Sequence, residues 1–105
     1  MIARIWHGYT SIENAPKYEN VLINEVIPSI EDKKIEGYRN ISVLKRSLKG
    51  EFEFITIMRF DNLECIKNFV GEDYERSYVP ESAKQVLSRF DAKAQHYDII
   101  DEIIY

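Results

Sequence analysis

Cysteine is nearly absent from the chain, and several other features that identify a class of protein are missing too. Cys65 is the single cysteine among 105 residues, so no disulfide can form within the chain and the paired cysteines of a zinc ribbon are excluded. No apolar run approaches the roughly 20 residues of a membrane span, and the opening MIARIW lacks the basic and long apolar segments of a signal peptide. We therefore expect a soluble, cytoplasmic protein without a membrane partner.

Clustered basic charge, glycine-rich loops and metal-ligand clusters are scarce as well. The 14 lysines and arginines are outnumbered by 18 acidic residues, and the net charge of -4 argues against a nucleic-acid partner, which needs clustered basic side chains. His7 and His96, the two histidines, have no third ligand at a recognisable spacing, so no metal site is expected. The four glycines stand alone, at positions 8, 37, 50 and 71, which gives no phosphate-binding loop. No cofactor is therefore predicted.

The chain is rich in apolar residues, 45% of the total, and their periodic segments fit one domain over residues 1–105. Residues 2–9 predict a strand that is apolar on both faces, which is typical of an inner strand. The SIENAP motif that follows predicts a helix start, with Asn14 as the cap and Pro16 in the first turn. Pro28 is expected to end that helix or to lie just beyond it.

Two strands joined by a hairpin follow. Residues 38–48 and 51–60 flank the KGE sequence around Gly50, which is a hairpin signal. The second of these strands alternates, and one of its faces is predicted to be core: Phe52, Phe54, Thr56, Met58 and Phe60. The other face carries Ile55 and Ile57 between charged residues, more apolar surface than a face open to water needs.

A second helical region and a last strand complete the chain. Asp61 with Glu64 three residues later resembles a capping box, and Gly71 fits the position after a helix end. Pro80 opens a further predicted helix, whose apolar residues follow one helical face: Ala83, Val86, Leu87 and Phe90. Residues 92–104 are predicted to form the final strand.

The predicted order of elements, β-α-β-β-α-β, is that of the ferredoxin-like α+β fold. Its four strands form an antiparallel sheet in the order 4-1-3-2, with both helical regions on one face, so the first and last strands are neighbours. The opposite face, with Ile55 and Ile57, would be bare in a monomer. We therefore expect a second copy of the chain to cover it, and the protein to be a homodimer.

Four stretches of the sequence resemble one known family: ARIWHG, EFEFITIMRFDNLECIKNFVGED, YVPES and HYDII. They are similar to the antibiotic biosynthesis monooxygenase (ABM) domain, and the resemblance extends from Ile2 to Ile100. It implies a dimeric α+β barrel, in which two ferredoxin-like sheets pair face to face with their helices outside.

The resemblance implies two possible chemistries. Some members of the family oxidise aromatic phenols with molecular oxygen and no cofactor, because the substrate carbanion itself reacts with oxygen in a dry pocket. A second branch opens the haem ring with an Asn on the first strand and a Trp and a His elsewhere. The first strand here, IARIWHGY, has no Asn and holds the sole tryptophan, so the haem-degrading set does not transfer. We expect a cofactor-independent monooxygenase-like protein that acts on a small aromatic or hydrophobic substrate.

Trp6 and His96 are the candidate catalytic residues, because the predicted sheet places the first strand beside the last. Trp6 is large enough to shape a cavity between sheet and helices, or it fills the core there. His96 can take a proton from a phenol or hold an oxyanion, or it is a hydrogen-bonded residue at the sheet edge. His7 has the opposite strand parity to Trp6, so we expect it at the dimer face or in solvent.

Three further residues are candidate substrate contacts. Arg4 shares the face of Trp6, and it either pairs with an anionic substrate group or forms a structural ion pair with an acidic helix residue. Tyr78 and Tyr97 each offer a phenolic hydrogen bond. Since the sequence holds no complete catalytic set, the alternative function is a non-catalytic dimeric barrel that binds a small hydrophobic ligand.

Overall fold

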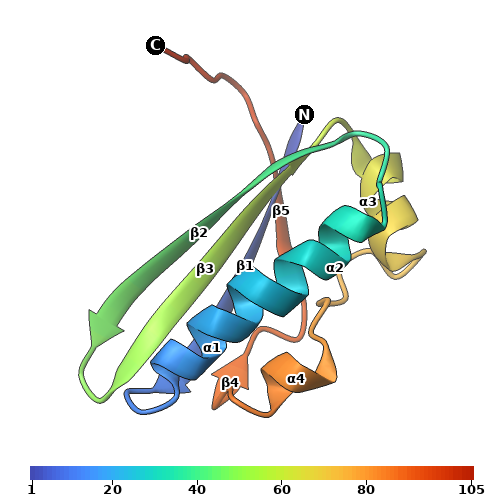
Figure 1. Ribbon diagram of the computed structural model, residues 1–105. Helices are drawn as coiled ribbons and strands as arrows, with labels where there is room; N and C mark the ends of the chain where they lie inside the picture. Colours follow the sequence, from blue (N-terminus) through green and yellow to red (C-terminus); the bar gives the residue numbers. More distant parts are fainter.

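All the strands lie in one antiparallel sheet in a computed structural model that describes residues 1–105 (Figure 1). Three long strands form the body of the sheet: β1 (Ile2–Ser11), β2 (Tyr38–Leu48) and β3 (Glu51–Phe60). Two short strands pair with β1: β4 (Arg89–Phe90) and β5 (Gln95–Asp98). The order β2-β3-β1-β4 confirms the predicted ferredoxin-like arrangement, except that the last strand is in two pieces.

The helices lie on one face of the sheet (Figure 1). The first helical run is continuous and consists of three parts: α1 (Ala15–Val21), the π-helical stretch η1 (Leu22–Val26) and α2 (Ile27–Asp32). Asn14 occupies the predicted N-cap position, but its side chain makes no capping hydrogen bond. The expectation that Pro28 ends this helix is wrong. Pro28 has no N–H to donate, but the π-helical turn before it lets the Ile27 N–H reach the Leu22 carbonyl, and the run continues to Asp32.

The core lies between this helical layer and the inner face of the sheet. The alternation predicted for β3 is confirmed, because Phe54 and Phe60 are fully buried on the inner face while Ile55 and Ile57 are half-buried on the outer face. The first helical run contributes apolar residues at helical spacing: Ala15, Tyr18, Leu22, Val26 and Ile30. No helix covers the outer face of the sheet (Figure 1).

The second helical region begins one residue later than the predicted capping box. Helix α3 (Leu63–Val70) has Asn62 as its N-cap, and the Asn62 side chain accepts a hydrogen bond from the Cys65 N–H at 3.1 Å. Asp61 is instead paired with Arg39 on β2. The helix ends at Gly71, as predicted, with a φ of 95° that favours glycine.

The helix predicted after Pro80 is much shorter than its apolar pattern indicates. Helix α4 (Glu81–Lys84) has four residues, and Phe90 belongs to β4, where it pairs with Gly8. Packing of the Phe90 ring at 6.1 Å from Trp6 overrides the helical periodicity of this segment. The last strand is also shorter than the predicted range 92–104. None of the helices has the length and apolarity needed to cross a membrane.

Candidate functional site

A partly enclosed cavity of about 40 Å³ lies between the inner face of the sheet and the helical layer. Its wall has 14 residues, of which 11 are hydrophobic. The sheet contributes Arg4 and Trp6 from β1, the first helical run contributes Tyr18, and the segment that follows α3 contributes Tyr78 and Ala83. The free cavity has room for roughly three water molecules. Its largely apolar wall is typical of sites for small organic molecules.

Trp6 is held in this wall by packing and by one hydrogen bond. Its indole Nε1–H donates to the backbone carbonyl of Asp91 at 3.0 Å, and its side chain packs against Phe90. The indole also lies directly over Gly8, where an added Cβ would stand only 2.6 Å from the Trp6 ring. The hydrogen bond and the packing together fix the orientation of the Trp6 ring in the cavity wall.

Arg4 is the only cationic residue in the wall, and it is 3% exposed. Its Nη1 donates to the Tyr74 carbonyl at 2.6 Å, and its Nη2 donates to the Arg76 carbonyl at 2.7 Å. The structural ion pair with an acidic helix residue, one of the two expectations for Arg4, is absent, because no carboxylate pairs with this guanidinium. Burial lowers the pKa of Arg4 to about 10, so the group stays charged at neutral pH.

His96 lies beside Arg4 but is not in the cavity wall. It stands opposite Arg4 in the β1–β5 pair, and its Nε2 is 2.9 Å from Arg4 Nη1. Because a guanidinium can only donate, the Nε2 atom is the acceptor and the imidazole is neutral with its proton on Nδ1. Burial, with Arg4 beside it, lowers the pKa of His96 below its ordinary value of 6.5. His96 is therefore hydrogen-bonded to Arg4 and makes no hydrogen bond or ring contact with Trp6.

The two candidate tyrosines lie on opposite sides of the sheet. Tyr78 is in the cavity wall, with its hydroxyl 2.9 Å from Ser29 Oγ and its ring 5.2 Å from that of Phe69. Tyr97 pairs with Ala3 on the outer face and is 51% exposed. A molecule in the cavity can therefore contact Tyr78, whereas Tyr97 is separated from it by the sheet.

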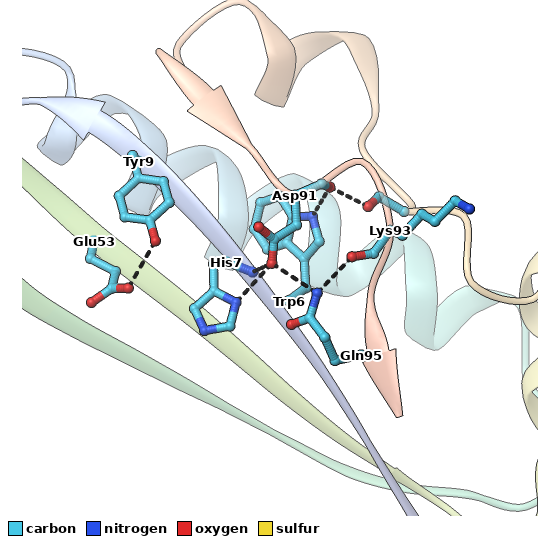
Figure 2. A network of polar contacts seen from close by, with 8 residues as sticks. Trp6, His7, Tyr9, Glu53, Asp91, Lys93 and Gln95 are labelled. Atoms are coloured by element: carbon cyan, nitrogen blue, oxygen red, sulfur yellow. Dashed lines mark hydrogen bonds and ion pairs between the residues drawn. The ribbon is translucent and has the colours of Figure 1, made fainter. Parts of the chain in front are cut away.

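Asp91, which no sequence pattern singles out, contacts side chains on both faces of β1 (Figure 2). Its carboxylate contacts His7 Nδ1 at 2.8 Å and Gln95 Nε2 at 3.2 Å on the outer side of β1, while its carbonyl accepts from Trp6 on the inner side. The break between β4 and β5 places Asp91 beside β1, and no local sequence pattern predicts such a break. His7 itself faces away from Trp6, as strand parity predicts.

A second group of polar contacts lies near the His7–Asp91 contact on this outer face (Figure 2). The Tyr9 hydroxyl donates to Glu53 at 3.1 Å, and Arg46 pairs with the other oxygen of Glu53. No group of three or more His, Cys, Asp or Glu side chains is placed to hold a metal ion.

Solved structures of the same fold match the chain over nearly its whole length. One is a protein from Bacillus cereus that has been assigned provisionally as an antibiotic biosynthesis monooxygenase: it is 18% identical, the match covers 100% of this chain and 96% of that one, and the TM-score is 0.70. Rv0793 from Mycobacterium tuberculosis is 14% identical, with 96% of each chain covered and a TM-score of 0.59. An EthD family protein from Bacillus halodurans is 16% identical over 95% of this chain and 100% of that one, with a TM-score of 0.55.

Comparison of the sequence alone finds no related protein. No protein-family model matches the chain, and no curated protein matches it. At 14–18% identity the solved structures establish the fold and nothing finer. The likeness indicated by the sequence is therefore confirmed as one of fold: the chain has the ferredoxin-like α+β fold of antibiotic biosynthesis monooxygenase-like structures.

Proposed function

We propose that the chain oxidises a small aromatic or hydrophobic molecule with molecular oxygen, without a cofactor, in the cavity beside Trp6. The observation that carries this proposal is an apolar wall that contains a single buried cation, Arg4. A cation in a dry site stabilises the carbanion or phenolate that must form before oxygen can react. The fold shared with ABM-like structures supports the same reading by analogy.

The proposed reaction converts an activated CH₂ group and O₂ into a ketone and water. Loss of one proton to solvent water gives the carbanion, whose electron pair forms a bond to one oxygen atom and reduces O₂ to a bound peroxide. Loss of the second C–H proton then breaks the O–O bond, and the oxygen that leaves takes up two protons as water. Oxygen is reduced and the carbon is oxidised by four electrons in total, so no external reductant is needed.

The residues have separate roles in this proposal. Trp6 shapes the cavity, and Tyr78 offers one phenolic contact from the wall. His96 touches the site only through Arg4, so we assign it the role of holding the guanidinium rather than that of a base in contact with substrate. The cavity must widen before it admits an aromatic ring, because about 40 Å³ is well below the 150 Å³ of an engineered cavity known to hold benzene.

We also propose that the protein is a homodimer that buries the outer face of the sheet. That face exposes Leu44 and Tyr97 by 45% and 51% and carries the half-buried Ile55 and Ile57. The segment after β5 extends past the sheet (Figure 1) with Ile100 fully exposed. Exposed and half-buried apolar side chains gathered on one sheet face are typical of a protein interface.

Oxygen uptake tests the catalytic proposal. Purified protein supplied with anthrone, whose activated CH₂ group becomes the second ketone of anthraquinone, should consume one O₂ per molecule oxidised, with no accumulation of hydrogen peroxide. Trp6→Leu should lower the rate at least tenfold by reshaping the wall, while Phe52→Leu, an aromatic-to-leucine change on the same sheet face outside the wall, should leave it unchanged. Uptake no faster than in a protein-free solution would refute the proposal.

A second candidate function is binding without turnover. It is favoured by one specific observation: the only titratable side chains in the wall are Arg4, Tyr18 and Tyr78, so no ordinary base touches the cavity. This alternative predicts that an aromatic ligand quenches the fluorescence of Trp6, the sole tryptophan, without any oxygen consumption.

A further inference from the structure

Arg4 is a buried cation with no anion beside it. Its three polar contacts are the carbonyls of Tyr74 and Arg76 and the neutral ring of His96, and none of them carries a full negative charge. The Phe69 ring, 5.6 Å from the guanidinium, adds only a cation–π contact. An ionic group taken out of water without a counter-charge is expensive for the fold. The cost falls when an anion enters the cavity that Arg4 lines.

Arg4 also retains hydrogen-bonding capacity. A guanidinium has five N–H donors. The contacts to Tyr74 and His96 use both hydrogens of Nη1, and the contact to Arg76 uses one hydrogen of Nη2. The Nε–H and the second Nη2–H have no protein acceptor. Free guanidinium donors of this kind bind the oxygens of a carboxylate or a phenolate through charge-assisted hydrogen bonds.

We infer that the ligand of this cavity is a small monoanion, with one ionised carboxylate or phenolate group that binds Arg4 and an apolar body that contacts Trp6. The inference rests on the proposed function, and it adds the charge class of the substrate. One cation balances one negative charge, so a dianion such as a phosphate monoester leaves a buried charge unmatched. An amine is repelled by Arg4, and a neutral aromatic leaves the guanidinium without its counter-charge.

A purely structural role for Arg4 makes a different prediction. In that case its bonds to Tyr74 and Arg76 serve to fasten the segment between α3 and α4 to the sheet. Replacing Arg4 would then lower the free energy of unfolding, but the wild-type protein would show no preference for anionic over neutral ligands. Ligand selectivity in the unaltered protein therefore separates the two roles, even where a variant of Arg4 does not fold.

The experiment compares benzoate with benzamide and benzylamine, three probes of similar shape and different charge, by calorimetric titration at pH 7. Benzoate should bind about ten- to a hundredfold more tightly than benzamide, which is the range for a charge-assisted hydrogen bond, and benzylamine should not bind. Arg4→Gln should abolish the difference, and Arg4→Lys should keep part of it. The matched control is Lys49→Gln, which removes one positive charge at an exposed hairpin position.

4-Nitrophenol distinguishes a phenolate site from a carboxylate site, because its ionised form absorbs visible light. If the site accepts phenolates, wild-type protein should lower the apparent pKa of the bound phenol and raise its visible absorbance at a fixed pH slightly below that pKa. Binding of benzoate without this change would restrict the ligand to carboxylates, within the inferred class.

Two results would overturn the inference, and they can be told apart. Equal affinity for benzoate and benzamide would remove the charge preference and leave the proposed oxidation of a neutral aromatic intact. Failure of all the probes, including 4-nitrophenol, to bind while anthrone is still oxidised would overturn the inferred ligand class alone, whereas absence of both binding and oxygen uptake would refute the proposed function as well.

Discussion

The two largest inward side chains of β1, Arg4 and Trp6, are held by the backbone of a segment far along the sequence. Arg4 donates to the carbonyls of Tyr74 and Arg76, and Trp6 donates to the carbonyl of Asp91. These bonds satisfy buried donors that would otherwise cost stability. They also make the wall of the cavity depend on where an irregular stretch of chain passes, rather than on β1 alone.

Whether replacing Gly8 by alanine stabilises or destabilises the protein depends on the side chains packed around it. In an open strand position alanine is more stable than glycine. Here a Cβ would meet the Trp6 ring at 2.6 Å and Leu87 at 3.1 Å, so Gly8→Ala should destabilise the protein by about 1–3 kcal/mol. Urea unfolding followed by Trp6 fluorescence measures the change. Ser47→Ala, at an exposed position on β2, is the control and should change stability by less than about 0.5 kcal/mol.

His96 should make the free energy of unfolding depend on pH. Its folded pKa lies below its ordinary value of 6.5, through burial and the proximity of Arg4, with Glu75 acting in the opposite direction. The unfolded chain therefore binds a proton more readily than the folded one, and stability should fall as the pH drops from about 7 through 6.5 and below. Urea unfolding at a series of pH values measures this slope.

The matched variant for this prediction is His96→Asn, which keeps an acceptor for Arg4 but does not titrate. It should remove the part of the slope that belongs to His96. An unchanged profile in His96→Asn would show that protonation of His96 does not oppose the buried Arg4.

At the scale of elements, the first helical run shows how one irregularity preserves a buried face. The residues from Ala15 to Ile30 that face the sheet keep their helical spacing through Pro28. They do so because the π-helical stretch η1, in which the Ile27 N–H bonds the Leu22 carbonyl, accommodates a proline that has no N–H to donate. Four of these residues, Tyr18, Leu22, Val26 and Ile30, line the cavity. The continuity of this helix is therefore a condition for the shape of the site.

Helix α3 offers a prediction about its N-terminus. Asn62 accepts a hydrogen bond from the Cys65 N–H, so Asn62→Ala should lower the free energy of unfolding by about 0.5–2 kcal/mol. The same substitution at Asn68, exposed within the helix, should be neutral or slightly stabilising because alanine is the better helix former. Equal effects at both positions, measured by urea unfolding, would contradict the capping role.

At the scale of the whole molecule, the proposed dimer rests on the outer face of the sheet. Light scattering on the eluted protein should give twice the chain mass of 12.4 kDa. Ile57→Asp, in the middle of this face, should shift the protein to the monomer while its circular dichroism stays that of the folded chain. Ile23→Asp, at a 48% exposed position on the helical side, is the control and should leave the mass unchanged.

Much of the architecture follows from the sequence alone. Alternation along residues 51–60 identified the buried and exposed faces of β3, and the order of periodic segments gave the sheet order. Strand parity separated Trp6 from His7. Such predictions succeed because a two-residue period is a local property that a buried face imposes on every strand.

What only the tertiary structure decided lies between residues 71 and 98. Local periodicity predicted a helix through Phe90, but contact with Trp6 draws Phe90 into a strand, and the break after it brings Asp91 to both faces of β1. The same segment supplies the carbonyls that leave Arg4 buried without a carboxylate. The sequence by itself determined which face of each strand is apolar, since that depends on neighbours along the chain. The environment of the buried charge depends on residues some 70 positions away, and only the folded chain brings them together.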